Sequence, residues 1–538
     1  MKIDPEELVE LLRDSPRGKH AKSHVSHFAP YTARDGRSIE LSKFRLPTNG
    51  GDPSDVRQIL DDELSLDGRP ALNLASFVST YLEPEAERLL KDNYNKNLAD
   101  SDEYPTLMDI HARCVSILAN LWHVQPGERA IGTATTGSSE AIQLGGLAMK
   151  RRWKEKREAE GKDTSKPNII MGANAQVALE KFARYFEVEA RILPVSKESH
   201  HRLDERLVKE NVDENTIGVY IILGSTYTGH FEPVQTIAEL LDEVQKEKGL
   251  DVPIHVDAAS GGLVAPFTDA GVGGGAWDFK IRRVHSINVS GHKYGLVSPG
   301  LGWIIFRDQH YLPRHLVFEL NYLGGKEESY TLNFSRPGGQ VVVQYFNFMR
   351  LGFTGYKRIM ENCLAVARLL SRSLEATGWY RCLSDVHRKK GDWGYHGQKE
   401  FVRSESSADY NEGLPVVAFA FTEQFKKEYP HVKQAAVSQL LRARQYIVPN
   451  YPLPANEQNT EILRVVVRES VSMDLIDRLI GDLVSVTETV MQISEGDLAA
   501  WQSLSADSVE KMHSTKKRKR SVEEDRKQGK MAIHTAVC

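Results

Sequence analysis

Short apolar runs recur through the middle of the chain, and segments with helical spacing separate several of them. The clearest runs, each typical of a buried strand, lie at 167–172, 217–224, 252–259, 284–291 and 301–307. Residues 236–249 carry apolar side chains three and four positions apart, which predicts a helix. Strands that alternate with helices predict an α/β fold with a mainly parallel sheet. Ligands of such sheets bind beyond the carboxyl ends of the strands, so we expect a site in the polar loops after these runs.

A different pattern follows residue 355. Residues 355–378 have the apolar spacing of a long helix, and a helical segment at 437–446 lies between apolar runs at 414–422 and 461–469. This order predicts a smaller α+β domain. Residues 387–413 are polar and have no period, so we expect them to form an exposed excursion.

The two ends of the chain are more polar than the middle. Asp4 followed by Pro5 predicts the start of a helix, and the turn-rich residues up to 70 predict an arm. The highly charged residues at the other end predict a disordered tail. We therefore predict four parts, divided as 1–71 (helix and arm), 72–355 (large domain), 356–500 (small domain) and 501–538 (tail).

Composition and charge exclude several classes of protein. Of the 538 residues, 41% are hydrophobic and 26% charged, as in soluble globular proteins, and the net charge of −4 argues against a nucleic-acid partner. No apolar run is long enough to span a membrane, and the N-terminus lacks the apolar block of a signal peptide. The four cysteines, Cys114, Cys363, Cys382 and Cys538, form no CxxC pair, which argues against a zinc site or a disulfide framework. We therefore expect a protein of the reducing cytoplasm.

The first stretch with candidate chemistry is "TGSSEA" at 136–141, just before a helical segment. The unpaired N–H groups and positive dipole end of a helix suit a phosphate. The hydroxyls of Ser138 and Ser139 add donors there, and Gly137 lets the backbone approach closely. Taken alone, however, the stretch is more typical of an ordinary helix N-cap.

Two further loops follow apolar runs. Asp257 ends one run, where its carboxylate can act as a base, cap the next turn or pair with a cationic ring nitrogen. A metal is disfavoured, because no second acid or histidine pair stands at ligand spacing. Lys293 lies in "SGHKYG" between two runs. Burial would lower the pKa of its amine and make it a nucleophile toward aldehydes, whereas a surface lysine beyond a strand end is the plainer alternative.

Together, the phosphate cradle, Asp257 and Lys293 match the needs of pyridoxal 5′-phosphate. Its aldehyde forms a Schiff base with a lysine, and its phosphate suits a helix N-terminus. Its ring nitrogen needs an acidic partner to stay protonated, which makes the ring an electron sink.

Longer motifs run in order over about residues 58–480. They include "NLASFVSTYLEPEA" (73–86), "NYNKNLADSDEYP" (93–105), "GTATTGSSEA" (132–141), "HVDAASGG" (255–262), "SGHKYG" (290–295), "NFSRPGGQV" (333–341) and "RVVVRE" (464–469). The chain thereby resembles the bacterial, plant and fungal glutamate decarboxylases, which are group II pyridoxal-phosphate decarboxylases of fold-type I. The resemblance implies a large cofactor-binding domain with a mainly parallel seven-stranded sheet and a smaller C-terminal α+β domain.

The resemblance also implies roles for individual residues. Lys293 is the Schiff-base lysine, Asp257 pairs with the ring nitrogen, and Lys293 or Tyr322 returns a proton to the substrate carbon. The further residues implied to contact the cofactor are Ser138, Ser139, Gln176, Thr226, Ala259, His292 and Ser335. Ser335 is implied to reach the phosphate from the partner subunit of a homodimer or hexamer, in which the N-terminal arm makes dimer contacts.

The implied substrate is L-glutamate, and both of its carboxylates need partners. Arg464 matches the arginine that holds the α-carboxylate, for which a planar guanidinium is suited. The implied contacts of the distal carboxylate are Ser76, Phe77, Asn97 and, from the neighbouring chain, Asp100. Ser76 stands where bacterial members have Thr, so the hydroxyl is kept and a methyl group is lost. The implied products are 4-aminobutyrate and CO2, with one proton consumed.

Two other interpretations stay open. One is a pyridoxal-phosphate decarboxylase or lyase that acts on another amino acid, because "HVDAASGG" and "SGHKYG" are shared more widely than the substrate-side motifs. The other is a non-catalytic scaffold that acts through its tail. The basic run from Lys516 to Arg520 is typical of a nuclear import signal or, with the segment around Trp501, of the calmodulin targets of plant members. Acidic residues follow at once and no apolar face accompanies the run, which favours a solvated tail.

Overall fold

The structure is a computed structural model that describes residues 46–47, 50–272, 275–320, 327–397 and 403–493. Residues Pro70–Gln492 form one compact unit, and the described residues before Pro70 belong to a separate part. That part holds helix α3 (Pro53–Leu64), which begins where the Asp52 side chain accepts a hydrogen bond from the Ser54 N–H. The sequence predicted only a turn-rich arm here. The predicted helix after Asp4 and the charged tail lie outside the described residues.

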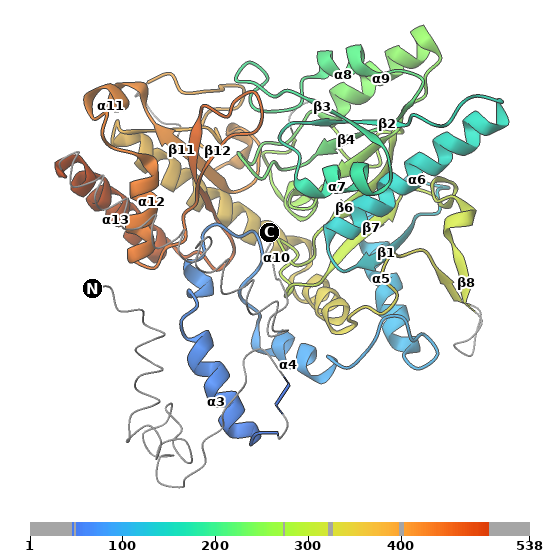
Figure 1. Ribbon diagram of the computed structural model, residues 1–538, viewed down its shortest axis with the longest axis horizontal. Coiled ribbons are helices and arrows are strands. Elements are labelled where there is room, and N and C mark those ends of the chain that lie inside the picture. Colours follow the sequence, from blue (N-terminus) through green and yellow to red (C-terminus); the bar gives the residue numbers. More distant parts are fainter. Residues whose placement is uncertain (1–45, 48–49, 273–274, 321–326, 398–402, 494–538) are drawn as a thin grey trace, which may run out of the picture. The chain divides into compact units, whose positions relative to one another are not determined.

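A seven-stranded sheet forms the core of the compact unit (Figure 1). Its strands are β1 (Ile131–Thr135), β2 (Asn168–Gly172), β3 (Glu189–Leu193), β4 (Thr216–Ile222), β5 (Ile254–Asp257), β6 (Val284–Val289) and β7 (Gly302–Phe306). They lie in the order β1-β7-β6-β5-β4-β2-β3. Every neighbouring pair from β6 to β3 is parallel, whereas β7 is antiparallel to both of its neighbours. The predicted α/β fold with a mainly parallel seven-stranded sheet is confirmed.

Helices pack on this sheet. Helix α6 (Ser138–Ala159) packs along β4, β5, β6 and β7, and α5 (Pro105–Leu121) packs against β1 and β7. The remaining helices of this region are α4 (Pro84–Asp92), α7 (Val177–Tyr185), α8 (Glu205–Asn211) and α9 (Val234–Lys248), the last being the helix predicted at 236–249. The shorter elements are η2 (Pro70–Leu72), η3 (Gly261–Leu263), η4 (Ala265–Phe267), η5 (Gln309–Tyr311), η6 (Arg314–Leu316), β8 (Phe318–Leu320) and β9 (Glu327–Ser329).

A second, four-stranded sheet follows in the sequence. Its antiparallel strands are β10 (Tyr380–Cys382), β11 (Val416–Phe421), β12 (Asn450–Pro452) and β13 (Glu461–Val466), in the order β10-β11-β13-β12. Its helical elements are α10 (Gly339–Ala376), η7 (Ser407–Asp409), α11 (Glu423–Glu428), α12 (Gln434–Ala443) and α13 (Met473–Gln492). Helix α10 starts well before the predicted position 355 and is kinked at Gly352, whose φ of 57° is left-handed. Because α10 contacts α4 and α5 as well as β10 and β11, it joins the two regions.

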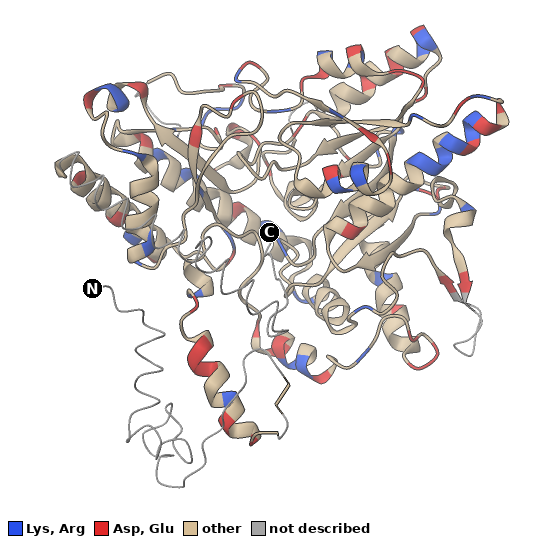
Figure 2. Cartoon of the chain, in the orientation of Figure 1, with Lys and Arg blue, Asp and Glu red and all other residues tan. Residues whose placement is uncertain are grey.

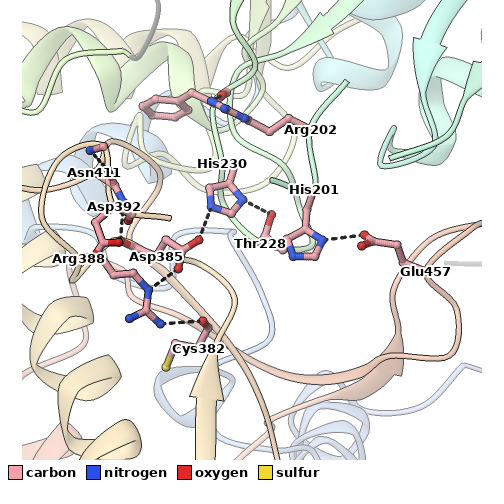
Figure 3. Close-up of polar contacts among 12 residues, drawn as sticks. His201, Arg202, Thr228, His230, Cys382, Asp385, Arg388, Asp392, Asn411 and Glu457 are labelled. Carbon is pink, nitrogen blue, oxygen red and sulfur yellow. Dashed lines mark hydrogen bonds and ion pairs between the residues drawn. The ribbon is translucent and has the colours of Figure 1, made fainter. Parts of the chain in front are cut away.

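The excursion predicted at 387–413 is exposed at many of its described residues, such as 389–391 and 405–406, but its two ends are buried, so the prediction was wrong there. Figure 3 shows the reason at one of its ends. Asp385 accepts a hydrogen bond from Arg388 Nε (2.6 Å), and its other oxygen lies 3.8 Å from Nε2 of the buried His230, which follows β4. Arg388 also pairs with Glu375 of α10 (2.6 Å). These polar side chains are buried because they pair with one another, which a lack of apolar period does not reveal.

Replacing Asp385 with alanine is expected to lower the free energy of unfolding by about 3 kcal/mol, because the buried guanidinium of Arg388 loses one of its two carboxylate partners. Urea unfolding followed by circular dichroism measures the change. A matched control is Glu423→Ala, which removes the exposed pair with Lys426 and should cost less than about 1 kcal/mol. Equal effects of the two substitutions would contradict a role of the buried cluster in stability.

No helix among the described residues is long and apolar enough to cross a membrane. Charged side chains are spread over both regions of the compact unit, as Figure 2 shows.

Candidate active site

Lys293 lies in the turn that follows β6, and its amine reaches the loop after β5. There Nζ donates a hydrogen bond to Ser260 Oγ (3.1 Å). Burial lowers the pKa of the Lys293 amine from 10.5 to about 8; the carboxylate of Asp257 opposes this shift, and the guanidinium of Arg464 adds to it. The amine is therefore available as a nucleophile closer to neutral pH than that of an ordinary lysine.

Asp257 is the last residue of β5 and is buried. Its Oδ1 accepts hydrogen bonds from the Ala259 N–H (3.1 Å) and from Asn288 Nδ2 (2.9 Å). The first of these is the turn cap that an aspartate after a strand commonly makes. Both bonds go to Oδ1, so the second carboxylate oxygen remains for a ligand. Asp257 is also close enough to Lys293 for its charge to raise the pKa of that amine.

The predicted phosphate cradle is the N-terminus of α6, which follows β1. Gly137 precedes the helix with a φ of 152°, and Ser138 is buried and accepts a hydrogen bond from Ser290 Oγ (2.7 Å). A Cβ atom on Gly302 of β7 would lie 2.4 Å from the carbonyl carbon of Gly137, so only glycine there lets the strand approach the helix start. Ser139 is exposed at the same turn. The free N–H groups of this turn are suited to an anion.

The segment 75–79 lies between Lys293 and the second sheet. The Phe77 ring has the Lys293 amine 5.3 Å from its centre and the guanidinium carbon of Arg464 at 5.2 Å. Arg464, on β13, donates to the carbonyl oxygens of Thr226 and Ala75, each at 2.5 Å. Ser76 is next to Phe77, and its Oγ accepts a hydrogen bond from the Val78 N–H (3.1 Å). The structure thus brings together two cations and the predicted substrate residues Ser76 and Phe77.

A cavity of about 330 Å³ opens beside Arg464. It is lined by Ala75, Ala175, Gln176, Val177, Thr226, Tyr227, Pro449, Tyr451 and Arg464. Gln176 is exposed at the start of α7, where its side chain accepts a hydrogen bond from the Ala178 N–H (2.6 Å). Gln176 and Thr226, predicted as cofactor residues, therefore share one cavity wall with the predicted substrate arginine.

Two unpaired polar atoms indicate that these residues fit a polar ligand. His292 Nδ1 and Arg464 Nε are buried without a hydrogen-bond partner among the described residues. Burial, together with the charge of Lys293, lowers the pKa of His292 to about 4, so the ring is neutral. A nucleophilic amine, an acid at a strand end and an anion-binding helix start are the donor set that pyridoxal 5′-phosphate requires. The described residues hold no cluster of three or more His, Cys, Asp or Glu side chains suited to a metal.

Asn97, Asp100 and Ser335 form a separate group. Asn97 Nδ2 donates to Ser335 Oγ (3.3 Å), and the Asp100 N–H donates to the Asn97 carbonyl oxygen (3.2 Å). Within the described part of this chain, no hydrogen bond joins these three residues to Lys293. The other predicted proton donor, Tyr322, lies outside the described residues.

The sequence did not point to three residues that this geometry brings into the site, Ser260, Asn288 and Tyr451. Ser260 accepts a hydrogen bond from Lys293, and Asn288 donates one to Asp257. A signal for Asn288 was present, because polar residues stand at alternate positions 286, 288 and 290, along β6 and at the residue after it. Tyr451 carried no such signal, since only the pairing of β12 with β13 places it near Arg464.

The lowered pKa of Lys293 predicts how its reactivity depends on pH. The unprotonated, nucleophilic amine predominates above about pH 8 and is lost as pH falls through that value, whereas an ordinary lysine needs a pH near 10.5. Labelling of the cofactor-free protein with a small aldehyde and borohydride, read by peptide mass spectrometry over a pH series, measures the midpoint. Lys209, whose pKa two carboxylates raise, is the internal control. The same midpoint at both lysines would refute the prediction.

Comparisons with known proteins agree with this geometry. Residues 47–389 match the family model described as the pyridoxal-dependent decarboxylase conserved domain. The chain is 48% identical over 479 residues to a glutamate decarboxylase of Saccharomyces cerevisiae, covering 86% of this chain and 81% of the relative. It is 45% identical to a glutamate decarboxylase of Petunia hybrida, with 87% of each chain covered. The solved glutamate decarboxylase of Lactobacillus brevis has a TM-score of 0.76 at 38% identity, covering 85% of this chain and 98% of that chain.

Proposed function

Because the chain belongs to the pyridoxal-dependent decarboxylase family, and glutamate decarboxylases match it over most of its length, we infer that it converts L-glutamate to 4-aminobutyrate and CO2 with the uptake of one proton. The observation that carries this conclusion is the identity of 48% and 45% to two glutamate decarboxylases over more than four fifths of every chain. The cofactor is pyridoxal 5′-phosphate, as the family requires.

The loops around Lys293 would hold this cofactor. When bound, it draws electrons from the bond that joins the departing carboxylate to the α-carbon. Lys293 offers the amine, Asp257 stabilises a protonated ring nitrogen, and the start of α6 with Ser138 and Ser139 receives the phosphate. The residues that complete the cofactor pocket in this proposal are Gln176, Thr226, Ala259 and His292.

The cavity beside Arg464 would hold the substrate. Arg464 is oriented by two backbone carbonyls and stacks on Phe77, so its guanidinium is fixed before a carboxylate arrives. Ser76 supplies a hydroxyl beside the same ring. With the substrate bound, Lys293 is the group of the described chain best placed to hold and return a proton, because its pKa lies near 8.

A homo-oligomer completes the proposal. Asn97, Asp100 and Ser335 share no hydrogen bond with Lys293 within the described part of one chain, which supports a contribution from a partner subunit.

A cytoplasmic location is supported by three free cysteines, Cys114, Cys363 and Cys382, all buried as thiols. Calmodulin binding by the basic run that begins at Lys516 is the less favoured part, and that run lies outside the described residues.

Release of CO2 from single amino acids tests the function. The full-length protein, supplied with pyridoxal 5′-phosphate, should release gas from L-glutamate and not from L-aspartate or the aromatic amino acids. Release from another amino acid in preference to glutamate would indicate the related decarboxylase or lyase. A lack of release from all of them, with no visible absorbance of bound cofactor, would favour the non-catalytic scaffold.

A further inference from the structure

Strand β6 carries buried polar side chains at alternate positions, although it lies inside the sheet. Ser286, Asn288 and the following Ser290 are all buried. Side chains alternate along a strand, so the three share one face, and we call them the polar column. Helix α6 covers this face, because a Cβ atom on Gly145 would lie 2.4 Å from the His255 ring that the column binds.

Each member of the polar column contacts a different part of the site. Asn288 Nδ2 donates to Asp257 Oδ1 (2.9 Å), and Ser290 Oγ donates to Ser138 Oγ at the start of α6 (2.7 Å). Next to them, His255 lies 2.7 Å from Asn288 Oδ1 through Nε2 and 2.7 Å from Ser286 Oγ through Nδ1. The result is a continuous relay of hydrogen bonds, Ser286–His255–Asn288–Asp257, that is buried throughout.

The chemistry of the groups determines the direction of this relay. Asp257 Oδ1 is an acceptor, as its bond from the Ala259 N–H shows, so Asn288 presents its NH2 group to it and turns its carbonyl oxygen toward His255. That oxygen accepts, so His255 carries its proton on Nε2. Burial lowers the pKa of His255 to about 4, so the ring is neutral and its Nδ1 accepts from the Ser286 hydroxyl.

The relay adds a second donor to Asp257, beside the one from the Ala259 N–H. Since both bonds are made to Oδ1, they fix the rotation of the carboxylate and leave Oδ2 without a hydrogen bond among the described residues. A fully satisfied network in the interior holds such an orientation firmly.

We propose that Asn288 and His255 are positioning residues, which hold the carboxylate of Asp257 in the orientation that leaves Oδ2 for the ring nitrogen of the cofactor. Both act through Asp257. The proposal rests on the proposed use of pyridoxal 5′-phosphate and concerns only how this chain holds the acid that the cofactor needs.

The test uses the full-length protein reconstituted with pyridoxal 5′-phosphate and the substitution Asn288→Leu, which keeps the size of the side chain and removes its donor. The dissociation constant of the cofactor should rise about 10- to 100-fold, by analogy with the loss of hydrogen-bond partners behind metal-ligating side chains. The pH at which the visible absorbance of the bound cofactor changes should shift as well. For glutamate, kcat should fall while KM changes little, because Arg464 and Ser76 are untouched.

A matched control is Asn168→Leu. Asn168 is equally buried in β2, donates to Asp213 Oδ1 (2.8 Å) and accepts from Thr216 Oγ1 (2.8 Å), but it lies at the start of its strand, away from the site. It should lower stability without changing the absorbance titration. His255→Gln, which can keep a donor near the Nε2 position, should restore much of what His255→Leu loses.

The outcomes separate the relay from the function. If the wild type binds no cofactor, the proposed function fails and the relay with it. If the wild type binds cofactor and both Asn288→Leu and His255→Leu match it in affinity and absorbance titration, the relay alone is overturned. If Asn288→Leu does not fold, the comparison of His255→Leu with His255→Gln decides, since rescue by glutamine supports the relay and no difference between them overturns it.

Discussion

Replacing Lys293 with alanine is expected to lower kcat for CO2 release from glutamate by at least roughly 10⁴-fold, as when a nucleophile of a catalytic unit is removed. The side chain is half-buried and hydrogen-bonded only to Ser260 among its described polar partners, so its loss leaves no large unpaired group. The fold should therefore persist. The protein should also lose the borohydride-trapped adduct at residue 293.

The measurement combines steady-state CO2 release with unfolding curves of both proteins. Lys150→Ala is the matched control, because Lys150 is also a partly buried lysine with a lowered pKa, but its amine donates to the carbonyl oxygen of Phe186, which follows α7. It should keep near-normal turnover. Turnover by Lys293→Ala within tenfold of the wild type would exclude Lys293 as the reactive amine.

The central strands could be predicted from the sequence, and the edge strands could not. Strands β2, β4, β5, β6 and β7 are almost wholly buried, and apolar residues therefore dominate β2, β4 and β7 and alternate with polar ones in β5 and β6. The edge strands β1 and β3 each pair with a single neighbour and carry partly exposed residues, which interrupts the apolar pattern. The three-residue strands β10 and β12 are too short to show a period at all.

The sequence predicted those site residues whose type and position in the chain alone indicate their chemistry. Lys293, Asp257 and the start of α6 stand at or directly after strand ends, and the parallel sheet brings such positions to one edge. Asn288 and Ser260 were not predictable in this way, because their importance comes from which residue they face across neighbouring strands and loops. The prediction that 387–413 is exposed failed at Arg388 for the same reason, because the carboxylate partners of Arg388 come from Glu375 of α10 and from Asp385.

Replacing Asp257 with asparagine is expected to lower kcat about 10²- to 10³-fold, the usual cost of removing one preorganised electrostatic group. The substitution is informative because the shape of the side chain is retained. The amide oxygen of asparagine can still accept from the Ala259 N–H and from Asn288, so the turn and the relay remain. Only the negative charge that stabilises a protonated ring nitrogen is lost, and KM for glutamate should change much less than kcat.

The matched control for this charge is Asp278→Asn. Asp278 is buried to the same extent, 4% exposed as is Asp257, and likewise accepts a hydrogen bond from the N–H two residues on (3.0 Å). Its second oxygen contacts His123 rather than the site, so its asparagine variant should keep near-normal kcat despite some loss of stability. Measured together with the absorbance of bound cofactor, equal kcat values in the two variants would show that charge at Asp257 does not assist the reaction. A large loss confined to Asp257→Asn assigns the effect to charge, because packing and turn geometry change alike in both.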